Sequence, residues 1–259
     1  MIHPTSIIDK NARISKNAKI GPYTIIGPNV EIDDNVEVCS HVNIEGNTII
    51  SEDNEIFSFS SIGTIPQDLK YQGEKSKLVI GKKNTIREHV TMNPGTKGGG
   101  MTTKIGDNCL FMVGSHIAHD CTIGNNVIMA NNATLGGHVH VGDFVVIGGL
   151  SAVHQFIRIG SFAIIGGFSG VESDVIPYGR VKGERAFLAG LNLIGLERQG
   201  FEKDKIKTLQ KAYNTLFQND GTLENRIQKV QEDFGDNEAV SKIRSTNHIE
   251  IFDIFRQIR

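Results

Sequence analysis

Residues 117–153 read IAHDCTIGNNVIMANNATLGGHVHVGDFVVIGGLSAV, and they contain the clearest repeat in the chain. An apolar residue returns at every sixth position within it: Ile117, Ile123, Met129, Leu135, Val141, Ile147 and Val153. The same step, with one shift of phase by one residue between Met92 and Ile105, extends in both directions through Ile8, Ile14, Ile20, Ile26, Ile32, Val38, Ile44, Ile50, Ile56, Ile62, Ile80, Ile86, Met92, Ile105, Phe111, Ile159, Ile165 and Val171. A helix of about 3.6 residues per turn cannot keep such a stripe on one face, whereas short strands separated by corners can.

Three such six-residue units predict a triangular coil of 18 residues, and successive coils stack as parallel strands about 4.8 Å apart. A glycine often follows the apolar residue, as in Gly106 and Gly124, so we expect glycines to form the corners. From Ile2 to about Pro177 there is room for roughly ten coils, a prism about 45–50 Å long with a column of Ile and Val inside.

Two segments interrupt the repeat and are expected to project as loops, at about 64–79 and 93–104. The β-helix is predicted to span 1–179, and 180–259 to form a helical C-terminal domain. One helix is predicted around the apolar series Ile206, Leu209, Tyr213, Leu216 and Phe217, and a second from an N-cap at Thr222 through Phe234. A shorter apolar series, Ile249 to Phe255, closes the chain.

Composition narrows the class of protein. The formal net charge is −2, from 27 Lys and Arg against 29 Asp and Glu, which argues against nucleic acid as the main partner. The N-terminus does not resemble a signal peptide, and no apolar run reaches the length of a membrane helix, so we expect a cytoplasmic protein without membrane insertion. The three cysteines, Cys39, Cys109 and Cys121, lack metal or redox spacing and are expected to be small buried thiols.

The predicted geometry brings one polar cluster together. Residues 18 apart should stack, which aligns His119 with Gly137 and Gln155, and Asp120 with His138 and Phe156; His116 and His154 lie beside them. Three interpretations compete. The histidines serve structure only; or His116, His119 and His138 bind Zn²⁺, as in the γ-class carbonic anhydrases that share this fold; or one histidine is a general base for acyl transfer.

Several strings give the sequence a specific resemblance. They are His116-Ile117-Ala118-His119-Asp120-Cys121, Ala130-Asn131-Asn132-Ala133-Thr134-Leu135, Gly136-Gly137-His138-Val139, Ala152-Val153-His154-Gln155-Phe156, Pro66-Gln67-Asp68-Leu69-Lys70-Tyr71 and Asn93-Pro94-Gly95-Thr96. Together they resemble the UDP-N-acetylglucosamine acyltransferases of lipid A biosynthesis, over nearly the whole chain. The resemblance implies a left-handed β-helix, since the period itself does not fix the hand.

The resemblance also implies catalytic roles. His119 matches the base that takes the proton from the sugar 3-hydroxyl as it attacks the thioester of an (R)-3-hydroxyacyl carrier protein. The ordinary imidazole pKa of about 6.5 suits this task. Asp120 matches the carboxylate that supports the histidine, and Gly137 matches the position whose backbone N–H faces the developing oxyanion.

Further positions match substrate contacts: Gln67, Asp68, Lys70, His116, His138, His154, Gln155, Asn192 and Arg198. Gly149, Gly167 and Phe168 match the groove for the phosphopantetheine arm and acyl chain, where Gly167 measures chain length and favours a long chain. The resemblance implies a homotrimer with active sites between subunits, acyl carrier protein and a UDP-sugar as partners, and no metal or cofactor beyond the carrier's phosphopantetheine.

Three residues depart from the family pattern at the nucleotide end: Arg185, Ile194 and Gln199. The N-acyltransferase that acts later in the same pathway remains an alternative, although it usually has an additional N-terminal uridine-binding domain. A non-catalytic repeat scaffold is a second alternative. The sequence leaves open whether the acceptor has a 3-hydroxyl or a 3-amino group, because a neutral imidazole serves either.

Overall fold

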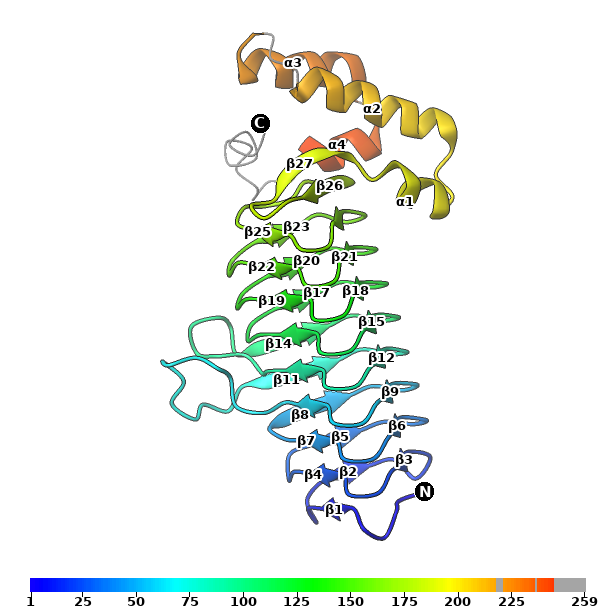
Figure 1. Cartoon of the computed structure of the whole chain (residues 1–259), viewed down its shortest axis with the longest axis vertical. Helices are drawn as coiled ribbons and strands as arrows, with labels where there is room; N and C mark the ends of the chain where they lie inside the picture. Colours follow the sequence, from blue (N-terminus) through cyan, green and yellow to red (C-terminus); the bar gives the residue numbers. More distant parts are fainter. Residues whose placement is uncertain (218–220, 236, 245–259) are drawn as a thin grey trace.

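The computed structural model describes residues 1–217, 221–235 and 237–244. It is a tall three-sided prism of stacked coils, with the N-terminus at one end and a group of helices at the other (Figure 1). Each coil contributes one short strand to each of three walls. Neighbouring strands within a wall are parallel, apart from the antiparallel pair that ends the third wall.

The three walls are built from strands two to five residues long. The first contains β1 (Ile7–Ile8), β4 (Ile25–Ile26), β7 (Asn43–Ile44), β10 (Ser61–Ile62), β13 (Thr91–Met92), β16 (His116–Ile117), β19 (Thr134–Leu135), β22 (Ala152–Val153) and β25 (Gly170–Val171). The second contains β2 (Arg13–Ile14), β5 (Glu31–Ile32), β8 (Asn47–Ile50), β11 (Lys77–Ile80), β14 (Thr102–Ile105), β17 (Thr122–Ile123), β20 (His140–Val141) and β23 (Arg158–Ile159). The third contains β3 (Lys19–Ile20), β6 (Glu37–Val38), β9 (Glu55–Ile56), β12 (Thr85–Ile86), β15 (Leu110–Phe111), β18 (Ile128–Met129), β21 (Val146–Ile147), β24 (Ile164–Ile165), β26 (Gly179–Lys182) and β27 (Phe187–Leu191).

The predicted 18-residue register is present in the pairing. His116 pairs with Thr134, and Thr134 pairs with Ala152 one coil further on. The last residue of most strands points into the prism and is buried; Ile44, Ile56 and Ile117 are 0% exposed. The prism therefore has the predicted internal column of aliphatic side chains, which removes apolar surface from water along the whole stack.

The corners differ from the expectation. The residues in the left-handed backbone region are mostly not glycines, and they lie three positions after the apolar residue, as at Asn108 and Asn126. The glycines that follow the apolar residues have another role, because they let adjacent coils approach closely. A Cβ at Gly106, for example, would collide with the carbonyl of Gly124 in the next coil. Glycine there is required by the spacing between coils.

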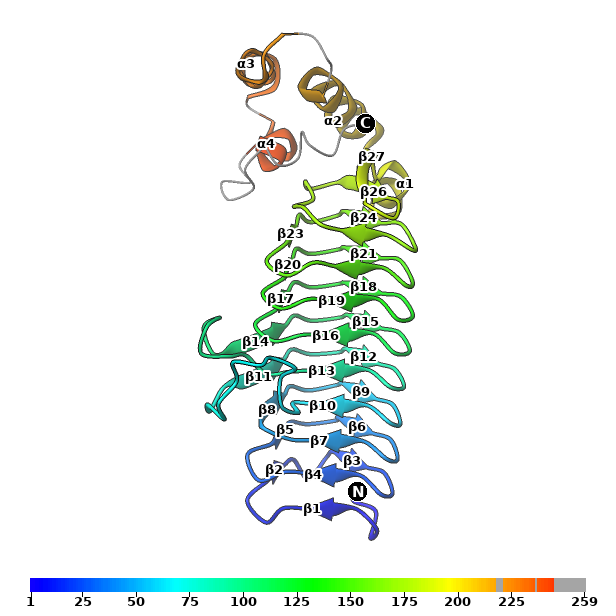
Figure 2. The same ribbon diagram turned by 60° about the vertical axis from the view of Figure 1, so that its left-hand side comes forward.

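Both predicted loops project from the same edge of the prism, where the chain passes from the first wall to the second (Figures 1 and 2). They precede β11 and β14, which are neighbours in the second wall, so the loops lie on adjacent coils. Because β11 begins at Lys77 and β14 at Thr102, the loops cover 63–76 and 93–101 and end slightly before the predicted limits. The predicted loops included the first residues of these strands because the polar and Gly-rich composition of each segment indicates a loop.

The C-terminal region begins with a hairpin rather than a helix. β26 continues the third wall beside β24, and β27 folds back on it. Residues 180–191 were predicted to belong to the helical domain, but they form this hairpin instead. The helices are α1 (Leu193–Arg198), α2 (Lys203–Phe217), α3 (Leu223–Phe234) and α4 (Glu238–Arg244), with the predicted Thr222 N-cap on α3 confirmed. The predicted series Ile249–Phe255 lies outside the described residues. Within the described part of the chain, no helix is long and apolar enough to cross a membrane.

Candidate active site

The polar cluster forms as the 18-residue register predicts. The His138 N–H donates to the His119 carbonyl, and the Phe156 N–H donates to the Gly137 carbonyl, so these corners stack coil upon coil. Beside them runs an open groove. It is lined by Gln67, Asn93, His116, Ala118, His119, Thr134, Leu135, Gly136, Gly137, Val153, His154 and Gln155.

His119, which lines this groove, forms a hydrogen-bonded pair with the buried Asp120. His119 Nδ1 lies 2.8 Å from Asp120 Oδ2; the Asp120 side chain is fully buried and that of His119 is 13% exposed. With the carboxylate ionised, this contact requires Nδ1 to carry the proton, which leaves Nε2 as a free acceptor. Asp120 sits at a corner with φ of 59°. The pair therefore presents an oriented imidazole to the groove.

Gly137 lies in the next coil against the imidazole face. A Cβ built on it would approach His119 Cε1 to 2.6 Å and Nε2 to 2.7 Å, closer than carbon atoms tolerate. Glycine is thus required here for the position of the His119 ring. The family resemblance gives Gly137 a role through its backbone N–H, and the structure adds this close contact with His119.

The loop 93–101 packs over the Asp120 carboxylate. The Thr96 N–H lies 2.9 and 3.0 Å from the two carboxylate oxygens, and the Thr96 hydroxyl donates to Oδ2 at 2.6 Å. Gly95 and Gly99 approach so closely that a Cβ on either would collide with the carboxylate or its surroundings. The sequence predicted no role for Thr96, although it stands in the Asn93-Pro94-Gly95-Thr96 string. Four glycines near Thr96 in the sequence, at 95, 98, 99 and 100, could have indicated a tightly packed loop around this residue.

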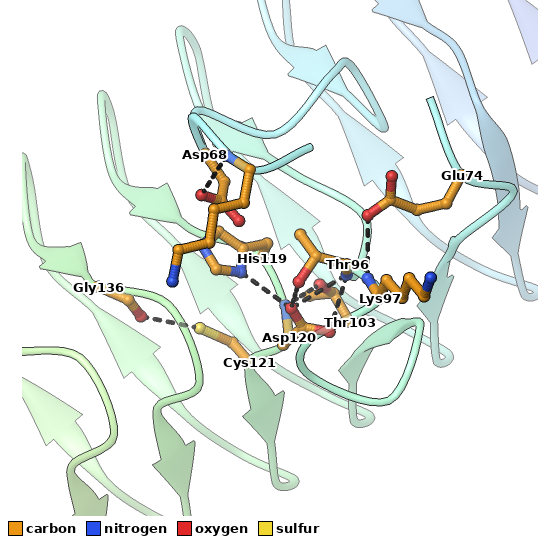
Figure 3. Close-up of polar contacts among 10 residues, drawn as sticks. Asp68, Glu74, Thr96, Lys97, Thr103, His119, Asp120, Cys121 and Gly136 are labelled. Atoms are coloured by element: carbon orange, nitrogen blue, oxygen red, sulfur yellow. Dashed lines mark hydrogen bonds and ion pairs between the residues drawn. The ribbon is translucent and has the colours of Figure 1, made fainter. Parts of the chain in front are cut away.

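The two loops are also tied to each other (Figure 3). Glu74 of the first loop accepts a hydrogen bond from the Lys97 N–H at 2.9 Å, next to Thr96. A second backbone donor, Gln72 N–H, lies 2.8 Å from the same carboxylate. These donors lower the pKa of Glu74, with Lys97 N–H the larger cause. An anionic Glu74 therefore connects the first loop to the segment that holds Asp120.

Burial favours the neutral form of two neighbouring histidines, His116 and His138. Burial lowers the pKa of His116, the His119 ring lowers it further, and His116 Nδ1 lies 2.7 Å from the Thr91 hydroxyl. Burial lowers the pKa of His138 too, against the opposing charge of Asp120. The His138 ring stacks on Phe156 at 4.3 Å between centroids and meets His119 edge-on at 5.0 Å. Both imidazoles are suited to hydrogen bonding without adding positive charge.

Most of the other predicted residues lie near this groove. Gln67, His154 and Gln155 line it. Asp68 lies close enough for its charge to act on His138, and its side chain accepts from the Lys70 N–H at 3.0 Å, which fixes the turn of the first loop. The Lys70 side chain is exposed.

The predicted acyl groove lies farther along the stack. Gly149 and Gly167 occupy equivalent corners of adjacent coils, and a Cβ on Gly167 would lie 3.3 Å from the Gly149 carbonyl oxygen. Phe168 beside them is 74% exposed. The role of these corners in holding an acyl chain stays a prediction.

Two predicted nucleotide contacts are not brought to the groove. Asn192 is buried and serves as the N-cap of α1, accepting from Gly195 N–H at 3.2 Å and donating to the Phe162 carbonyl at 2.9 Å. Arg198 is exposed in the last turn of the same helix. Asn192 is thus already engaged within the chain, and the nucleotide role of both residues stays a prediction.

The side chains that lie close enough to share a metal ion differ from the three histidines of the zinc interpretation. Among the described residues, the group whose ligand atoms lie within 4.8 Å of one another is His119, Asp120 and His138, and it does not include His116. Asp120 already accepts from Thr96 and lies in hydrogen-bond contact with His119. The predicted three-histidine set is therefore not the one that the fold brings together.

Comparison with known proteins agrees with the arrangement of walls and helices. The family model for domain 2 of UDP N-acetylglucosamine O-acyltransferase matches residues 174–248, and the bacterial transferase hexapeptide model matches 11–46 and 102–137. The structure of UDP-N-acetylglucosamine O-acyltransferase from Moraxella catarrhalis superposes with a TM-score of 0.92 at 41% identity, covering 96% of this chain and 97% of that one. LpxA from Acinetobacter baumannii gives 0.87 at 41% identity, covering 100% and 98%.

Sequence relatives extend over most of the chain. The acyl-(acyl-carrier-protein)–UDP-N-acetylglucosamine O-acyltransferase of Caulobacter vibrioides is 53% identical over 93% of this chain and 92% of its own length. That of Rickettsia canadensis is 54% identical over the same shares. The predicted fold class, a left-handed parallel β-helix with a C-terminal helical region, is confirmed. This chain belongs to the family of acyl-(acyl-carrier-protein)–UDP-N-acetylglucosamine O-acyltransferases.

Proposed function

We propose that this acyltransferase moves an (R)-3-hydroxyacyl chain from acyl carrier protein to the 3 position of UDP-N-acetylglucosamine, the first step of lipid A biosynthesis. Relatives at 46–54% identity over 93% of the chain are named for acyl carrier protein and this UDP-sugar. The observation that carries the mechanism is the 2.8 Å contact between His119 Nδ1 and Asp120 Oδ2. It leaves Nε2 free to accept a proton in the groove.

The chemical step follows from that orientation. His119 Nε2 accepts the proton of the sugar 3-hydroxyl while the oxygen forms a bond to the thioester carbonyl carbon. The tetrahedral oxyanion then collapses and breaks the C–S bond. The phosphopantetheine thiolate leaves and takes the proton from the imidazolium, which restores His119. Asp120 stabilises that imidazolium while it exists, and general base catalysis of this kind contributes about 10²–10⁴ in rate.

The Gly137 N–H is the proposed donor to the oxyanion. A Cβ built on Gly137 would come within 2.6 Å of the His119 ring, and this close approach of backbone and base supports the proposal. An amide fixed at the position of developing charge typically contributes about 2.7–4 kcal/mol to the transition state. No metal or cofactor is needed beyond the carrier's phosphopantetheine.

Substrate contacts are assigned from the groove outward. His116 and His138, whose neutral forms are favoured by burial, are proposed to bind the sugar together with Gln67, Asp68 and Gln155. Lys70 and His154 are proposed to contact the phosphates, and Arg198 the nucleotide. The reaction is proposed to take place in the cytoplasm.

The working unit is proposed to be a homotrimer. Tyr23, Phe59 and Leu150 occupy equivalent corners along one edge and are 60%, 54% and 54% exposed. Exposed apolar side chains along one edge, where His41, His89 and Asn132 occupy the corners between them, support contact with another chain. We expect sedimentation equilibrium of the purified protein to give the mass of three chains, and a monomer at assay concentration would contradict the trimer.

The function is tested with purified protein, a mixture of acyl carrier proteins carrying different chains, and both the 3-hydroxyl and 3-amino forms of the UDP-sugar. Mass spectrometry of the products identifies the acceptor and the chain. We expect an ester at the 3-hydroxyl. His119→Ala is expected to lose at least about 100-fold in kcat, whereas His140→Ala, an exposed histidine on β20, keeps wild-type transfer. Equal activity of the two variants would exclude His119 as the base.

A further inference from the structure

The Asp120 carboxylate depends on one residue outside the catalytic pair. Its side chain is fully buried, and its oxygens contact the Thr96 N–H, the Thr96 hydroxyl and His119 Nδ1. A buried carboxylate costs free energy unless donors replace the water it has lost. Within the described part of the chain, the carboxylate oxygens have hydrogen-bond contacts with two residues, His119 and Thr96.

We propose that Thr96 is a positioning residue for the acyl transfer. Its hydroxyl and N–H hold the Asp120 carboxylate in the plane and at the distance that orient His119, with Nδ1 toward the carboxylate and Nε2 toward the groove. This inference rests on the proposed function and adds a third member to the pair described above. Thr96 itself is buried and does not line the groove, so it acts through Asp120.

The surrounding backbone is built for this contact. Gly99 packs against the face of the carboxylate, where any Cβ would collide with Asp120 Cγ. The Gly99 and Met101 N–H groups both donate to the Thr96 carbonyl, at 3.1 and 3.0 Å, which closes the loop into a tight turn around it. Glu74 holds the next residue from the other side through the Lys97 N–H. The backbone donor of residue 96 would survive substitution, but the hydroxyl donor needs Thr or Ser.

The hydroxyl has a predictable electrostatic effect. A donor to the carboxylate spreads its negative charge, so removing the donor leaves more of that charge facing the imidazole. The protonated imidazole is then favoured, and the base becomes free only at higher pH. Thr96→Val should therefore move the acidic limb of the kcat/KM profile to higher pH, in addition to loosening the pair.

The test compares Thr96→Val, Thr96→Ser and a matched control, Thr24→Val. Thr24 is also fully buried, and its hydroxyl donates to the Cys39 carbonyl at 2.8 Å, far from the groove. We expect Thr96→Val to lower kcat about ten-fold, the effect of one hydrogen bond to a charged group, with little change in KM for the UDP-sugar. Thr96→Ser should restore both kcat and the pH profile, and Thr24→Val should change neither.

A readout without turnover separates this inference from the proposed function. The proton on His119 Nδ1 that faces Asp120 should give a downfield NMR signal, which shifts in Thr96→Val and returns in Thr96→Ser. If wild-type protein transferred no acyl chain, the function would be wrong, while this signal would still test the positioning. Should Thr96→Val not fold, Thr96→Ala is measured in its place. The proposal would be overturned if Thr96→Val, or Thr96→Ala in its place, kept the wild-type pH profile and the wild-type His119 Nδ1 proton signal. An equal loss of kcat in Thr24→Val would also overturn it.

Discussion

Gly137 lies one coil from His119, and an added Cβ would come within 2.6 Å of the imidazole Cε1. Eighteen residues of chain separate the two, yet one fixes the place of the other. We expect Gly137→Ala to displace the ring and to lower kcat about 100-fold or more, as the loss of an oriented base and oxyanion donor does. The fold should survive, because the collision is with a side chain that can rotate away. Steady-state kinetics and the melting temperature measure the two effects.

Gly106→Ala provides the contrast for that variant. Its Cβ would collide with the backbone carbonyl of Gly124, which cannot move without separating two coils. This substitution should lower the melting temperature clearly, by the several degrees that 1–3 kcal/mol represents. Activity per folded molecule should change little. If Gly137→Ala proved the more destabilising of the two and kept its kcat, the roles given to Gly137 and Gly106 would be wrong.

Chain-length selection should respond to Gly167. Its added Cβ meets only the Gly149 carbonyl oxygen at 3.3 Å, so a larger side chain extends along the outside of the prism instead of into the core. Gly167→Met should shift preference toward shorter acyl donors, by about ten-fold or more in relative kcat/KM, since each methylene excluded is worth about 1–3 kcal/mol. Competition between two acyl carrier proteins measures it. Phe168→Ala should shift preference toward longer chains; an unchanged ratio in both variants would remove the groove from this corner.

The three thiols should differ in reactivity. Burial raises the pKa of Cys109 to about 11 and that of Cys121 to about 12, with desolvation as the main cause. Since the thiolate is the reactive form, both should resist alkylation in the native protein. Burial also raises the pKa of Cys39, but this thiol is half-buried and should react first. Peptide mass spectrometry after iodoacetamide treatment distinguishes them, and denaturant should make all three react.

Stability should fall as the solution becomes acidic, partly through His116. Its folded-state pKa is lowered by burial, so the unfolded chain binds a proton at higher pH than the folded one. The stabilisation is present above the ordinary histidine value of about 6.5. It is lost progressively as pH falls from there through the lowered folded-state pKa. Melting temperatures at pH 7.5 and 5.5 should therefore differ less for His116→Gln than for wild type, and an identical difference would show that His116 does not contribute.

Much of this site could be predicted because a solenoid converts sequence spacing into distance. Once the 18-residue coil was recognised, the stacking of His119 with Gly137 and of Asp120 with His138 followed without further information. The hand of the helix came from the family resemblance, because a period carries no handedness. The roles of the corner residues were not predicted. Glycine is required where neighbouring coils touch, as at Gly106, and the repeat within one coil does not show that contact.

The remaining differences arise where the repeat ends. The hairpin of β26 and β27 lacks the six-residue step, so nothing in the pattern distinguished it from the helices that follow. Thr96 was missed because a loop residue acquires its partner only when the loop folds over the prism, and no spacing rule connects residue 96 with residue 120. Asn192 was matched to a nucleotide contact, yet its amide is used as an N-cap within the chain.

The most direct measurement is a crystal structure with the acylated UDP-sugar bound. The sugar O3 should lie about 2.6–3.2 Å from His119 Nε2, the reach of a general base. The ester carbonyl oxygen should lie about 2.7–3.1 Å from the Gly137 N–H, as an oxyanion donor requires. A product bound with O3 away from His119, or with its carbonyl turned from Gly137, would contradict the catalytic pairing of these two residues.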